Sequence, residues 1–593
     1  DNCPMGISIC YNVSVINQKR LYFFTGLIIF LLGLLLARLV YLQIIKYEHY
    51  SLKSARIRAR VIPNLAPRGH IYDRNKLVLA SSKPVFSAYI LPVKLENADL
   101  ASKVIANILH KDEKDIYQKI LRQKNKSFEP LLIKDYISFD TISLIEEQSY
   151  KLPGFVVGAR NIRAYNYDSL AAHVLGYIGE IDPKRLRRKS IEGYRSGDLI
   201  GLSGIENKYE PYLRGTNGGQ QVEVDPYGRP IKVLGNIEPI PGHNVALTID
   251  LELQKVAEKA LGTQKGAVVV IQPQTGDILV LVSHPAFDPN LFTAPVSPEK
   301  WAELHRAENP LHNRALTAYP SGSTFKIITA ITALEYNLAK PGDKYYCPGY
   351  FMLGKRKSDC WTVHRRINFF NGLVHSCDVV FYNLGLAAGP DRIHKMGTSF
   401  GLGQLTGIDL PGESAGLLPS GRWKQKTYNE PWYPGDSINY GIGQGFFQAT
   451  PLQMAYLMSI IANKGTGYQP HILKEVTNPE QELIYYFKPR ITRKVTLKES
   501  TWKFIDESLY QVVERGTGVA TKIMDINIAG KTGTAEDPPR EMPHAWFVSY
   551  APVKDPQLVI SVFVEGGGHG GAVAAPIARK IYQHYFEKAN RVE

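Results

Sequence analysis

No stretch of this sequence combines a cluster of arginine and lysine with interleaved aromatic residues, although the chain carries a formal net charge of +15. Proteins that bind nucleic acids usually gather their positive charge in such a patch. Its absence excludes a nucleic-acid partner from our interpretation. The positive charge either attracts an anionic polymer or a membrane surface, or is a diffuse property of a lysine-rich composition.

The sequence also lacks a complete phosphate-binding loop. Gly530-Lys531-Thr532 matches the end of that motif, but the motif requires a further glycine at position 525, where Asp525 stands. The glycine-rich segment 566–571 has no phosphate-loop lysine and predicts only a turn. We therefore exclude nucleotide chemistry of the P-loop type.

A cleavage site of small residues is missing after the one long apolar run. Leu21–Ala37 contains no charged residue, and Leu39–Ile45 extends the run past Arg38 to a length that spans a bilayer. Arg38 lies towards one end, from which its long side chain can reach the interface. We therefore favour an uncleaved signal anchor over a cleaved signal peptide.

The charges beside this run predict its orientation. Lys19 and Arg20 precede it and Lys46 follows it, so a modest positive-inside bias places the N-terminus in the cytoplasm. We expect residues 1–20 to be a cytoplasmic tail and residues 21–45 to be the single membrane span. Everything from about residue 46 onward would then lie outside the cytoplasm.

Three short motifs follow one another over roughly 200 residues. They are Ser323-Thr324-Phe325-Lys326, Ser376-Cys377-Asp378 and Lys531-Thr532-Gly533-Thr534. Each is common by chance, but the ordered set is not. Their residue types suit acyl transfer, because a serine hydroxyl is a weak nucleophile at neutral pH and needs an adjacent base.

The first motif predicts a nucleophile and a base on one helix face. Ser323 and Lys326 are three residues apart, and the run 327–334 predicts a buried helix that starts after Pro320 and Gly322. In its first turn, free backbone N–H groups and the helix dipole favour developing negative charge on Ser323. A desolvated Lys326 can lose its proton there and act as a general base.

The C-terminal part predicts an α/β fold of the α+β kind, with an antiparallel sheet flanked by helices. The predicted elements are a strand at Val245–Asp250, a helix at Leu251–Leu261, a hairpin of Gly266–Gln272 with Asp277–Ser283, a strand around Lys531, two further strands at Ala545–Tyr550 and Leu558–Val564, and a last helix near Ala575–Phe586. The last three strands form a simple antiparallel meander.

The three motifs together resemble the active site of penicillin-binding proteins and serine β-lactamases. Arg68-Gly69 and the residues up to Asn75 resemble the opening of the non-catalytic region of class B penicillin-binding proteins. Segments 431–437 and 439–445, and Asp378 at a position that is often Asn, resemble the elongation type. From residue 19 onward the chain is identified as a class B penicillin-binding protein, most like the penicillin-binding protein 2 group of the rod-elongation system.

The resemblance implies a role for each motif residue. Ser323 would be acylated with Lys326 as its base, and Ser376 would relay a proton between Lys326 and the leaving amine. Lys531 and Thr534 would face the substrate carboxylate. The backbone N–H groups of Ser323 and Thr534 would form the oxyanion hole. The remaining implied residues are Thr532 and Gly533, which would contact substrate, and Asp378, whose role is less defined.

Only 5 cysteines are present, and three of them gather with a histidine near the second motif. Cys347, Cys360, His364 and Cys377 make a Cys3His set of the kind that holds structural zinc. A disulfide is the rival, but three cysteines leave one over, which a metal explains better. The remaining pair, Cys3 and Cys10, precedes the apolar run.

The resemblance adds to the zinc hypothesis, since some elongation-type relatives hold zinc in this region through mixed carboxylate, histidine and cysteine ligands. Asp359 is therefore an alternative ligand to Cys360. A structural zinc would fix the loop that aims Ser376 and Asp378 at the active site. The acyl transfer itself would need no cofactor.

The resemblance divides the chain at about residue 245. Residues 46–244 would form a non-catalytic pedestal of the dimerisation type, and residues 245–593 the transpeptidase domain. The head insertion at 83–155 shows helical patterns in an otherwise polar, loop-rich segment. We interpret the pedestal motifs, such as those with Arg68, Arg163 and Glu206, as turns and buried charge pairs rather than catalytic groups.

The implied function is D,D-transpeptidation of peptidoglycan stem peptides through a serine acyl-enzyme that β-lactams trap. A D,D-carboxypeptidase or β-lactamase is a rival, against which the anchor and pedestal argue, and a β-lactam sensor would need several spans. A division-type class B enzyme is the nearest rival. No second enzymatic domain is recognisable, so the resemblance implies a SEDS-type membrane glycosyltransferase and elongation scaffold proteins as partners. It also implies that the chain is anchored in the bacterial inner membrane, with its catalytic domain outside the cytoplasm.

Overall fold

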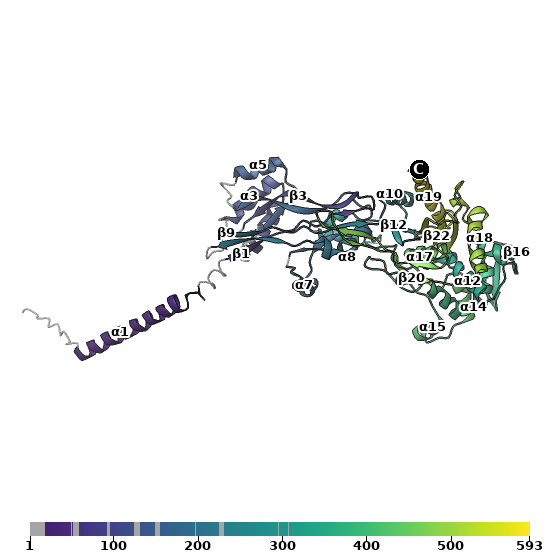
Figure 1. The fold of residues 1–593 in the computed structure, drawn as a ribbon, viewed down its shortest axis with the longest axis horizontal. Coiled ribbons are helices and arrows are strands. Elements are labelled where there is room, and N and C mark those ends of the chain that lie inside the picture. The colour runs from purple at the N-terminus through teal and green to yellow at the C-terminus, as the bar shows by residue number, and fades with distance from the viewer. Residues whose placement is uncertain are drawn as a thin grey trace, which may run out of the picture. The chain divides into compact units, whose positions relative to one another are not determined.

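The computed structural model describes residues 18–48, 50, 59–91, 95, 97–123, 131–148, 154–195, 197–224, 230–294, 296–305 and 308–592. They fall into two compact units (Figure 1). The smaller unit takes residues 1–65, 87–158 and 217–239, and the larger takes 66–86, 159–216 and 240–593. Segments 66–86 and 159–216, which we assigned to the pedestal, thus belong to the larger unit. Cys3, Cys10 and most of the predicted cytoplasmic tail lie outside the described residues.

The predicted membrane span forms one helical stretch. Helix α1 (Gln18–Val40) continues into the π-helical turn η1 (Tyr41–Ile45), and residues 20–45 are long and apolar enough to cross a membrane. Most of its leucine and phenylalanine side chains are exposed rather than packed against the chain. Burying such a surface in lipid is favourable, so the helix is compatible with a single-pass anchor.

The remainder of the smaller unit contains a three-stranded antiparallel sheet and a helical head. The sheet has the order β1-β8-β9. In the head, β4 pairs with the second half of β3. The elements are β1 (Ala59–Asn64), β8 (Gly218–Val224), β9 (Pro230–Ile237), β3 (Val78–Ile90), β4 (Leu131–Lys134), β5 (Phe155–Tyr165), α3 (Ala98–Leu109), α4 (Glu113–Gln123) and α5 (Phe139–Gln148).

The head has more order than its polar composition indicated. Ile105 and Leu109 of α3 pack with Ile116 and Ile120 of α4 in one buried hydrophobic core, at the four-residue spacing that puts side chains on one helix face. Asn97 caps α3 by accepting hydrogen bonds from two backbone N–H groups. The charged run 110–114 lies at the end of α3, in the short connection and at the start of α4, so the helical patterns in the sequence predicted this segment better than its composition did.

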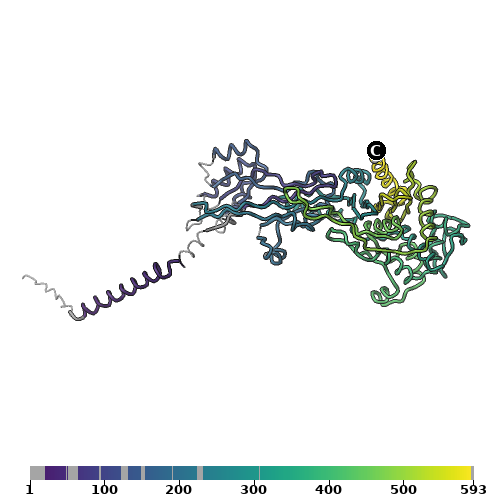
Figure 2. Tube along the Cα trace, in the orientation of Figure 1, coloured from purple at the N-terminus to yellow at the C-terminus, as the bar shows by residue number. Residues whose placement is uncertain are grey.

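The larger unit begins with a mixed sheet of order β19-β18-β10-β2-β3, in which only β10 and β2 are parallel. Strands distant in sequence, such as β10 and β18, therefore run side by side (Figure 2). Its elements are β2 (Ile71–Tyr72), β10 (Asn244–Leu247), β18 (Leu473–Thr477), β19 (Leu483–Tyr486), α6 (Ala172–Leu175), β6 (Ile178–Glu180), α7 (Pro183–Lys189), η3 (Ser190–Glu192), β7 (Leu199–Gly201), α8 (Gly204–Lys208) and α9 (Glu210–Leu213).

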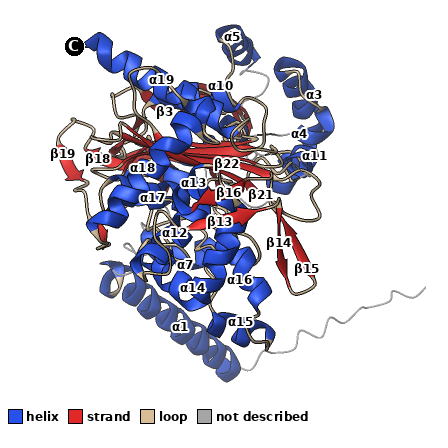
Figure 3. Cartoon of the chain, turned by 90° about the vertical axis from the view of Figure 1, so that its right-hand side faces the viewer, coloured by secondary structure: helices blue, strands red, loops and turns tan. Residues whose placement is uncertain are grey.

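The centre of the larger unit is a five-stranded antiparallel sheet of order β12-β11-β23-β22-β21 (Figure 3). It contains both the predicted hairpin and the predicted meander, so the expected α/β class with its antiparallel sheet is confirmed. Its strands and helices are β11 (Gly266–Gln272), β12 (Asp277–His284), β21 (Ala529–Ala535), β22 (His544–Ala551), β23 (Leu558–Val564), α10 (Leu251–Leu261), α12 (Lys326–Glu335), α14 (Asp378–Ser399), α17 (Pro451–Ala462), α18 (Glu499–Arg515) and α19 (Ala574–Val592).

Both faces of this sheet are buried, because side chains alternate between two cores. Trp546 and Val548 of β22 point into the core that α12, α14 and α17 cover, while Phe547 points into the core of α10 and α19. The smaller elements around it are η4 (Pro289–Phe292), α11 (Pro298–Leu304), η5 (Gly322–Phe325), β13 (Lys344–Cys347), β14 (Tyr350–Leu353), β15 (Arg356–Asp359), β16 (Arg365–Asn368), α13 (Phe369–Val374), α15 (Gly421–Tyr428), α16 (Pro434–Gly441), β17 (Thr466–Tyr468), β20 (Ile491–Lys494) and η6 (Val519–Thr521).

The pedestal motifs join in a buried ion network. Arg68 Nη2 lies 2.7 Å from a carboxylate oxygen of Glu206 and 2.7 Å from one of Glu210, and Arg163 Nε lies 2.5 Å from Glu206. Burial alone would raise the pKa of Glu206, but the charges of Arg163 and Arg68 outweigh it and hold the pKa below its usual value. The structural interpretation of these motifs therefore holds.

Removing the central carboxylate should destabilise the larger unit. We expect Glu206→Ala to cost about 3–5 kcal/mol and to lower Tm by roughly 10 °C, because fully buried Arg163 would keep its charge without a partner. Glu252→Ala is the control, since Glu252 pairs with Lys255 at the surface and its loss should cost under about 1 kcal/mol. Equal Tm values for the two variants in thermal unfolding would contradict this account.

Candidate active site

The turn that bears Ser323 is fixed against the edge strand β21. Residues Gly322–Phe325 form η5, which leads directly into α12, and the indole Nε1 of Trp546 donates a hydrogen bond of 2.9 Å to Pro320 O. Gly322 has φ +55°, and a Cβ there would lie 2.2 Å from the carbonyl oxygen of Thr534. Only glycine allows this approach, so the first and third motifs meet as predicted.

Gly533 allows the same approach from the side of the strand. A Cβ on Gly533 would come within 2.7 Å of Ser321 O and 3.0 Å of the Trp546 side chain. Glycine at this position therefore lets β21 pass directly beside the turn, which places half-buried Thr534 next to Gly322. Thr532 is bonded elsewhere, since its Oγ1 lies 2.6 Å from Oγ1 of Thr517.

Ser376 lies between two buried lysines. Lys326 Nζ donates to Ser376 O at 2.8 Å and lies 3.2 Å from Ser376 Oγ, while Lys531 Nζ donates to the same Oγ at 2.8 Å. Both lysines are fully buried, although desolvation was predicted only for Lys326. Ser376 has φ +54°, a left-handed conformation that is rare for serine and that aims its hydroxyl at the two amines.

Asp378 has a clear place that the sequence did not define. Its Oδ1 accepts a hydrogen bond of 2.7 Å from Lys326 Nζ, and its Oδ2 accepts one of 3.3 Å from the backbone N–H of Trp361. Asp378 is the first residue of α14. The carboxylate therefore pairs with the catalytic-motif lysine and ties it to the neighbouring loop.

The two lysines differ in their electrostatic surroundings. Burial lowers the pKa of Lys531 well below its usual value, the nearby charge of Lys326 lowers it further, and Asp378 opposes both effects. Lys326, in contrast, holds the Asp378 carboxylate directly at 2.7 Å. The arrangement offers a proton acceptor at Lys531 and a bridging hydroxyl at Ser376.

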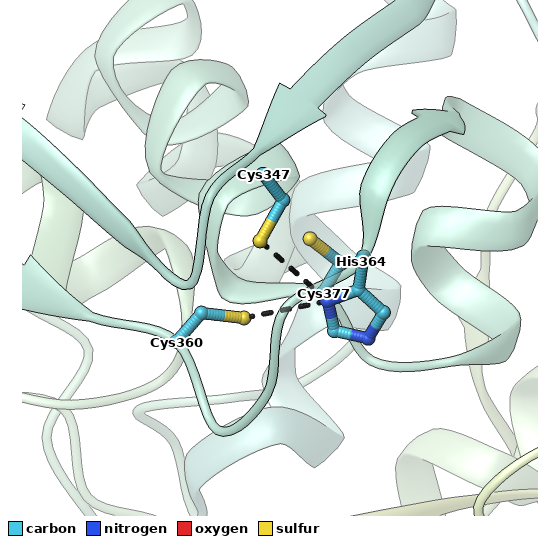
Figure 4. A group of neighbouring side chains, drawn as sticks. All are labelled: Cys347, Cys360, His364 and Cys377. Carbon is cyan, nitrogen blue, oxygen red and sulfur yellow. Dashed lines mark hydrogen bonds between the residues drawn. The ribbon is translucent and has the colours of Figure 1, made fainter.

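The predicted metal ligands form one cluster (Figure 4). Their Sγ and Nδ1 or Nε2 atoms all lie within 4.8 Å of one another, and they are Cys347, Cys360, His364 and Cys377. All three cysteines are free, so the rival disulfide is not formed. Asp359 stands outside the cluster, since its side chain is 72% exposed and its carboxylate pairs with Lys357 at 2.8 Å.

The cluster fits a metal in geometry and chemistry. Nδ1 of His364 lies 3.6 Å from Sγ of both Cys347 and Cys360. A tetrahedral zinc with bonds of about 2.3 Å to sulfur and about 2.0 Å to nitrogen separates such atoms by about 3.5 Å, close to the distances found here. The hydrogen bond between Cys377 and Cys360 lowers the pKa of the Cys360 thiol, which favours the thiolate that binds metals.

The cluster also contacts the catalytic motif. Sγ of Cys360 accepts a hydrogen bond of 3.3 Å from the backbone N–H of Asp378, and the next residue, Trp361, holds the carboxylate of Asp378. Sequence reasoning missed Trp361, whose indole also donates to His375 O at 3.1 Å. Its position next to Cys360 was the one indication in the sequence that Trp361 lies near the site. The contact itself could not be predicted, because any residue type can donate a hydrogen bond from its backbone N–H.

Comparison with known proteins supports the same family. Residues 266–583 match the penicillin binding protein transpeptidase domain, and residues 63–247 match the penicillin-binding protein dimerisation domain. Over 592 residues the chain is 35% identical to the peptidoglycan D,D-transpeptidase MrdA of Acinetobacter baumannii. The aligned region covers 96% of this chain and 88% of that protein.

Two solved structures are similar over most of their length. The complex of penicillin-binding protein 2 and MreC from Helicobacter pylori matches with a TM-score of 0.77 and 27% identity, over 89% of this chain and 100% of that chain. A structure of a peptidoglycan synthase complex that concerns the coordination of polymerization and crosslinking matches with a TM-score of 0.71 and 31% identity, over 96% and 98%. The family inferred from the three motifs is therefore confirmed, and the chain belongs to the class B penicillin-binding proteins, most like penicillin-binding protein 2.

Proposed function

We propose that this chain is a peptidoglycan D,D-transpeptidase that cross-links stem peptides during rod elongation. The observation that carries the proposal is the hydroxyl of Ser376 between the buried amines of Lys326 and Lys531, beside the turn that bears Ser323. Intact-mass analysis after incubation with benzylpenicillin tests it. A single stable adduct supports the transpeptidase, whereas drug consumption without an adduct would favour a hydrolase.

The first half-reaction forms an ester on Ser323. Its Oγ attacks the carbonyl before the terminal D-alanine of the donor peptide, and its proton passes to Lys326. As the C–N bond breaks, Lys326 returns that proton through Ser376 to the nitrogen of the leaving D-alanine. We assign the oxyanion hole to the backbone N–H groups of Ser323 and Thr534. An amine of a neighbouring stem peptide then attacks the ester, and Ser323 Oγ leaves and recovers its proton.

Lys326 can accept the proton of Ser323 only if it first gives up one of its own. We assign that transfer to Ser376, which accepts a proton from Lys326 and passes its own hydroxyl proton to Lys531. The lowered pKa of Lys531 supports this direction, because a neutral amine is available there at a pH where an ordinary lysine is charged. Asp378 positions Lys326 for the transfer.

Single-pass anchoring in the inner membrane, with the catalytic domain outside the cytoplasm, is the localisation that fits this substrate. The exposed apolar helix at 20–45 supports it. Elongation scaffold proteins and a SEDS-type membrane glycosyltransferase are the proposed partners. The relatives solved with MreC and as a synthase complex support these two partner classes.

We further propose that the Cys3His cluster holds a structural zinc. When bound, zinc would cross-link the end of β13 at Cys347 and the loop that carries Cys360 and His364 to Cys377 at the start of α14. Through the contacts of Cys360 and Trp361 with Asp378, the cluster would keep Asp378 in position for Lys326. The acyl transfer itself needs no cofactor in this proposal.

Metal analysis tests the zinc site directly. We expect about one zinc per chain in the purified protein, and its loss from Cys347→Ser together with a fall in Tm of several degrees, because structural zinc stabilises only the folded state. Asp359→Ala is the matched control, which should keep the zinc and the Tm. Retention of zinc by Cys347→Ser, or its loss from Asp359→Ala, would contradict this ligand set.

A further inference from the structure

Two β ribbons lie beside the second motif, on the end of the larger unit that faces the viewer in Figure 3. Strand β13 pairs with β16, and β14 pairs with β15. We call residues 343–368 the ribbon surface. Its inner side is packed, since Cys347 and Ile367 are buried and the ring of Phe351 lies 5.8 Å from that of Tyr382.

The outer side of the ribbon surface presents aromatic and cationic side chains together. Tyr346 is 66% exposed and pairs across the strands with Arg366, so both point to solvent, as does Lys344 two residues away. On the other ribbon, Nζ of Lys357 lies 5.1 Å from the ring centre of exposed Tyr350. Exposed rings among cations are typical of a binding surface rather than a solvated face.

The net charge of the ribbon surface is positive. Between Asp343 and Asn368 the sequence has six cations and two carboxylates, and Asp359 is already paired with Lys357. Among the residues that the structure describes, the other five cations have no ion pair; they are Lys344, Lys355, Arg356, Arg365 and Arg366. Four of these cations lie on the paired strands and Lys355 lies in the turn between β14 and β15. Unpaired cations held this way favour a partner that carries carboxylates.

The ribbon surface contacts the second motif through a hydrogen bond of Trp361 to Asp378. Trp361 is 58% exposed, yet its backbone N–H holds Asp378, which in turn holds Lys326. A partner bound on the ribbons would therefore approach Ser323 from the side of the second motif.

We propose that the ribbon surface binds the carboxylate-bearing stem peptides of the acceptor strand of peptidoglycan. This inference rests on the proposed transpeptidase function and names the surface that delivers the attacking amine. Arginine and lysine side chains would pair with the peptide carboxylates, while Tyr346 and Trp361 would cover apolar parts of the same strand. The donor peptide, in contrast, would be bound by the three motifs.

Binding of purified sacculi to the full-length protein in detergent tests the proposal. The protein is first acylated with benzylpenicillin, so that the donor site is blocked. We expect Lys344→Glu with Arg366→Glu to weaken sacculus binding about tenfold at low salt, since two charge reversals remove two attractions and add two repulsions. Arg579→Glu with Lys580→Glu on α19 is the matched control, with the same change in net charge at exposed positions, and should bind as the wild type does.

Four outcomes decide between these possibilities. Weaker binding of the ribbon variant alone, with an unchanged rate of acylation by benzylpenicillin, supports the acceptor surface. Equal binding of both variants overturns it, and so does wild-type binding that survives when an amidase has stripped the peptides from the sacculi, because the bound groups would then not be stem peptides. Failure of the wild type to be acylated would instead contradict the proposed function, whatever the sacculi show.

Discussion

Ser323→Ala should abolish acylation by benzylpenicillin and lower cross-linking by about 10⁴-fold or more, because removal of a nucleophile leaves no covalent route. Intact-mass analysis of the full-length protein is the measurement. The wild type is expected to gain one drug mass that persists for many minutes, and the variant none. The fold should be unaffected, since the hydroxyl of Ser323 lies on a turn that is held by the close backbone approach of Gly322 to Thr534 and by the indole of Trp546, which donates to Pro320 O.

Ser321 provides the matched control two residues earlier. Its side chain is fully buried, and its Oγ has no hydrogen-bond partner among the described residues. Ser321→Ala should therefore keep both the adduct and the Tm of the wild type. An adduct on Ser323→Ala, or its loss from Ser321→Ala alone, would show that the nucleophile has been assigned to the wrong serine.

Lys531→Arg should slow acylation by about 10²–10⁴-fold, although it preserves the positive charge. An arginine cannot accept a proton from Ser376 at any working pH, whereas the buried amine of Lys531 can. If Lys531 acted only as a cation for the substrate carboxylate, arginine would keep much of the rate. Stopped-flow acylation with a chromogenic β-lactam separates the two roles.

The pH profile gives a second readout of the same step. Because the pKa of Lys531 is lowered, the wild-type rate should fall as the pH drops through that value and protonates the amine, and it should recover above it. Lys531→Arg should lack this limb. Lys464→Arg is the control, since Lys464 also has a pKa lowered by burial but lies in the turn after α17. A wild-type rate or an unchanged acidic limb in Lys531→Arg would rule out the relay.

Much of the fold was predictable because both faces of the central sheet are buried. The strand at Leu558–Val564 and the helix at Leu251–Leu261 have the bounds that the apolar pattern indicated. The preceding strand was predicted too long, since β10 ends at Leu247 and Asp250 instead caps α10 by accepting a hydrogen bond from the backbone N–H of Leu253. The head was harder to predict, because its helices bury only a narrow apolar stripe and expose charged residues. The overall composition of such helices resembles that of a loop.

The site was predictable in its residues but not in its connections. Short motifs locate Ser323, Lys326 and Ser376, because the chemistry requires those side chains. The pairing of Asp378 with Lys326 depends instead on a backbone N–H of Trp361 and on a loop that closes across a cluster of sulfur ligands. Such contacts follow from three-dimensional placement, so spacing along the chain could not indicate them.

The contacts of Gly322 with Thr534 and of Gly533 with Ser321 limit which substitutions can make this protein resistant to β-lactams. Any side chain at either glycine would push the turn and the strand apart, by the overlap of a Cβ at 2.2 Å or 2.7 Å from a carbonyl oxygen. Substitutions that reduce β-lactam affinity there would also misplace Ser323 and cost the cell its own cross-links. Resistance mutations are therefore expected around this contact, on the loops that border it, and not within it.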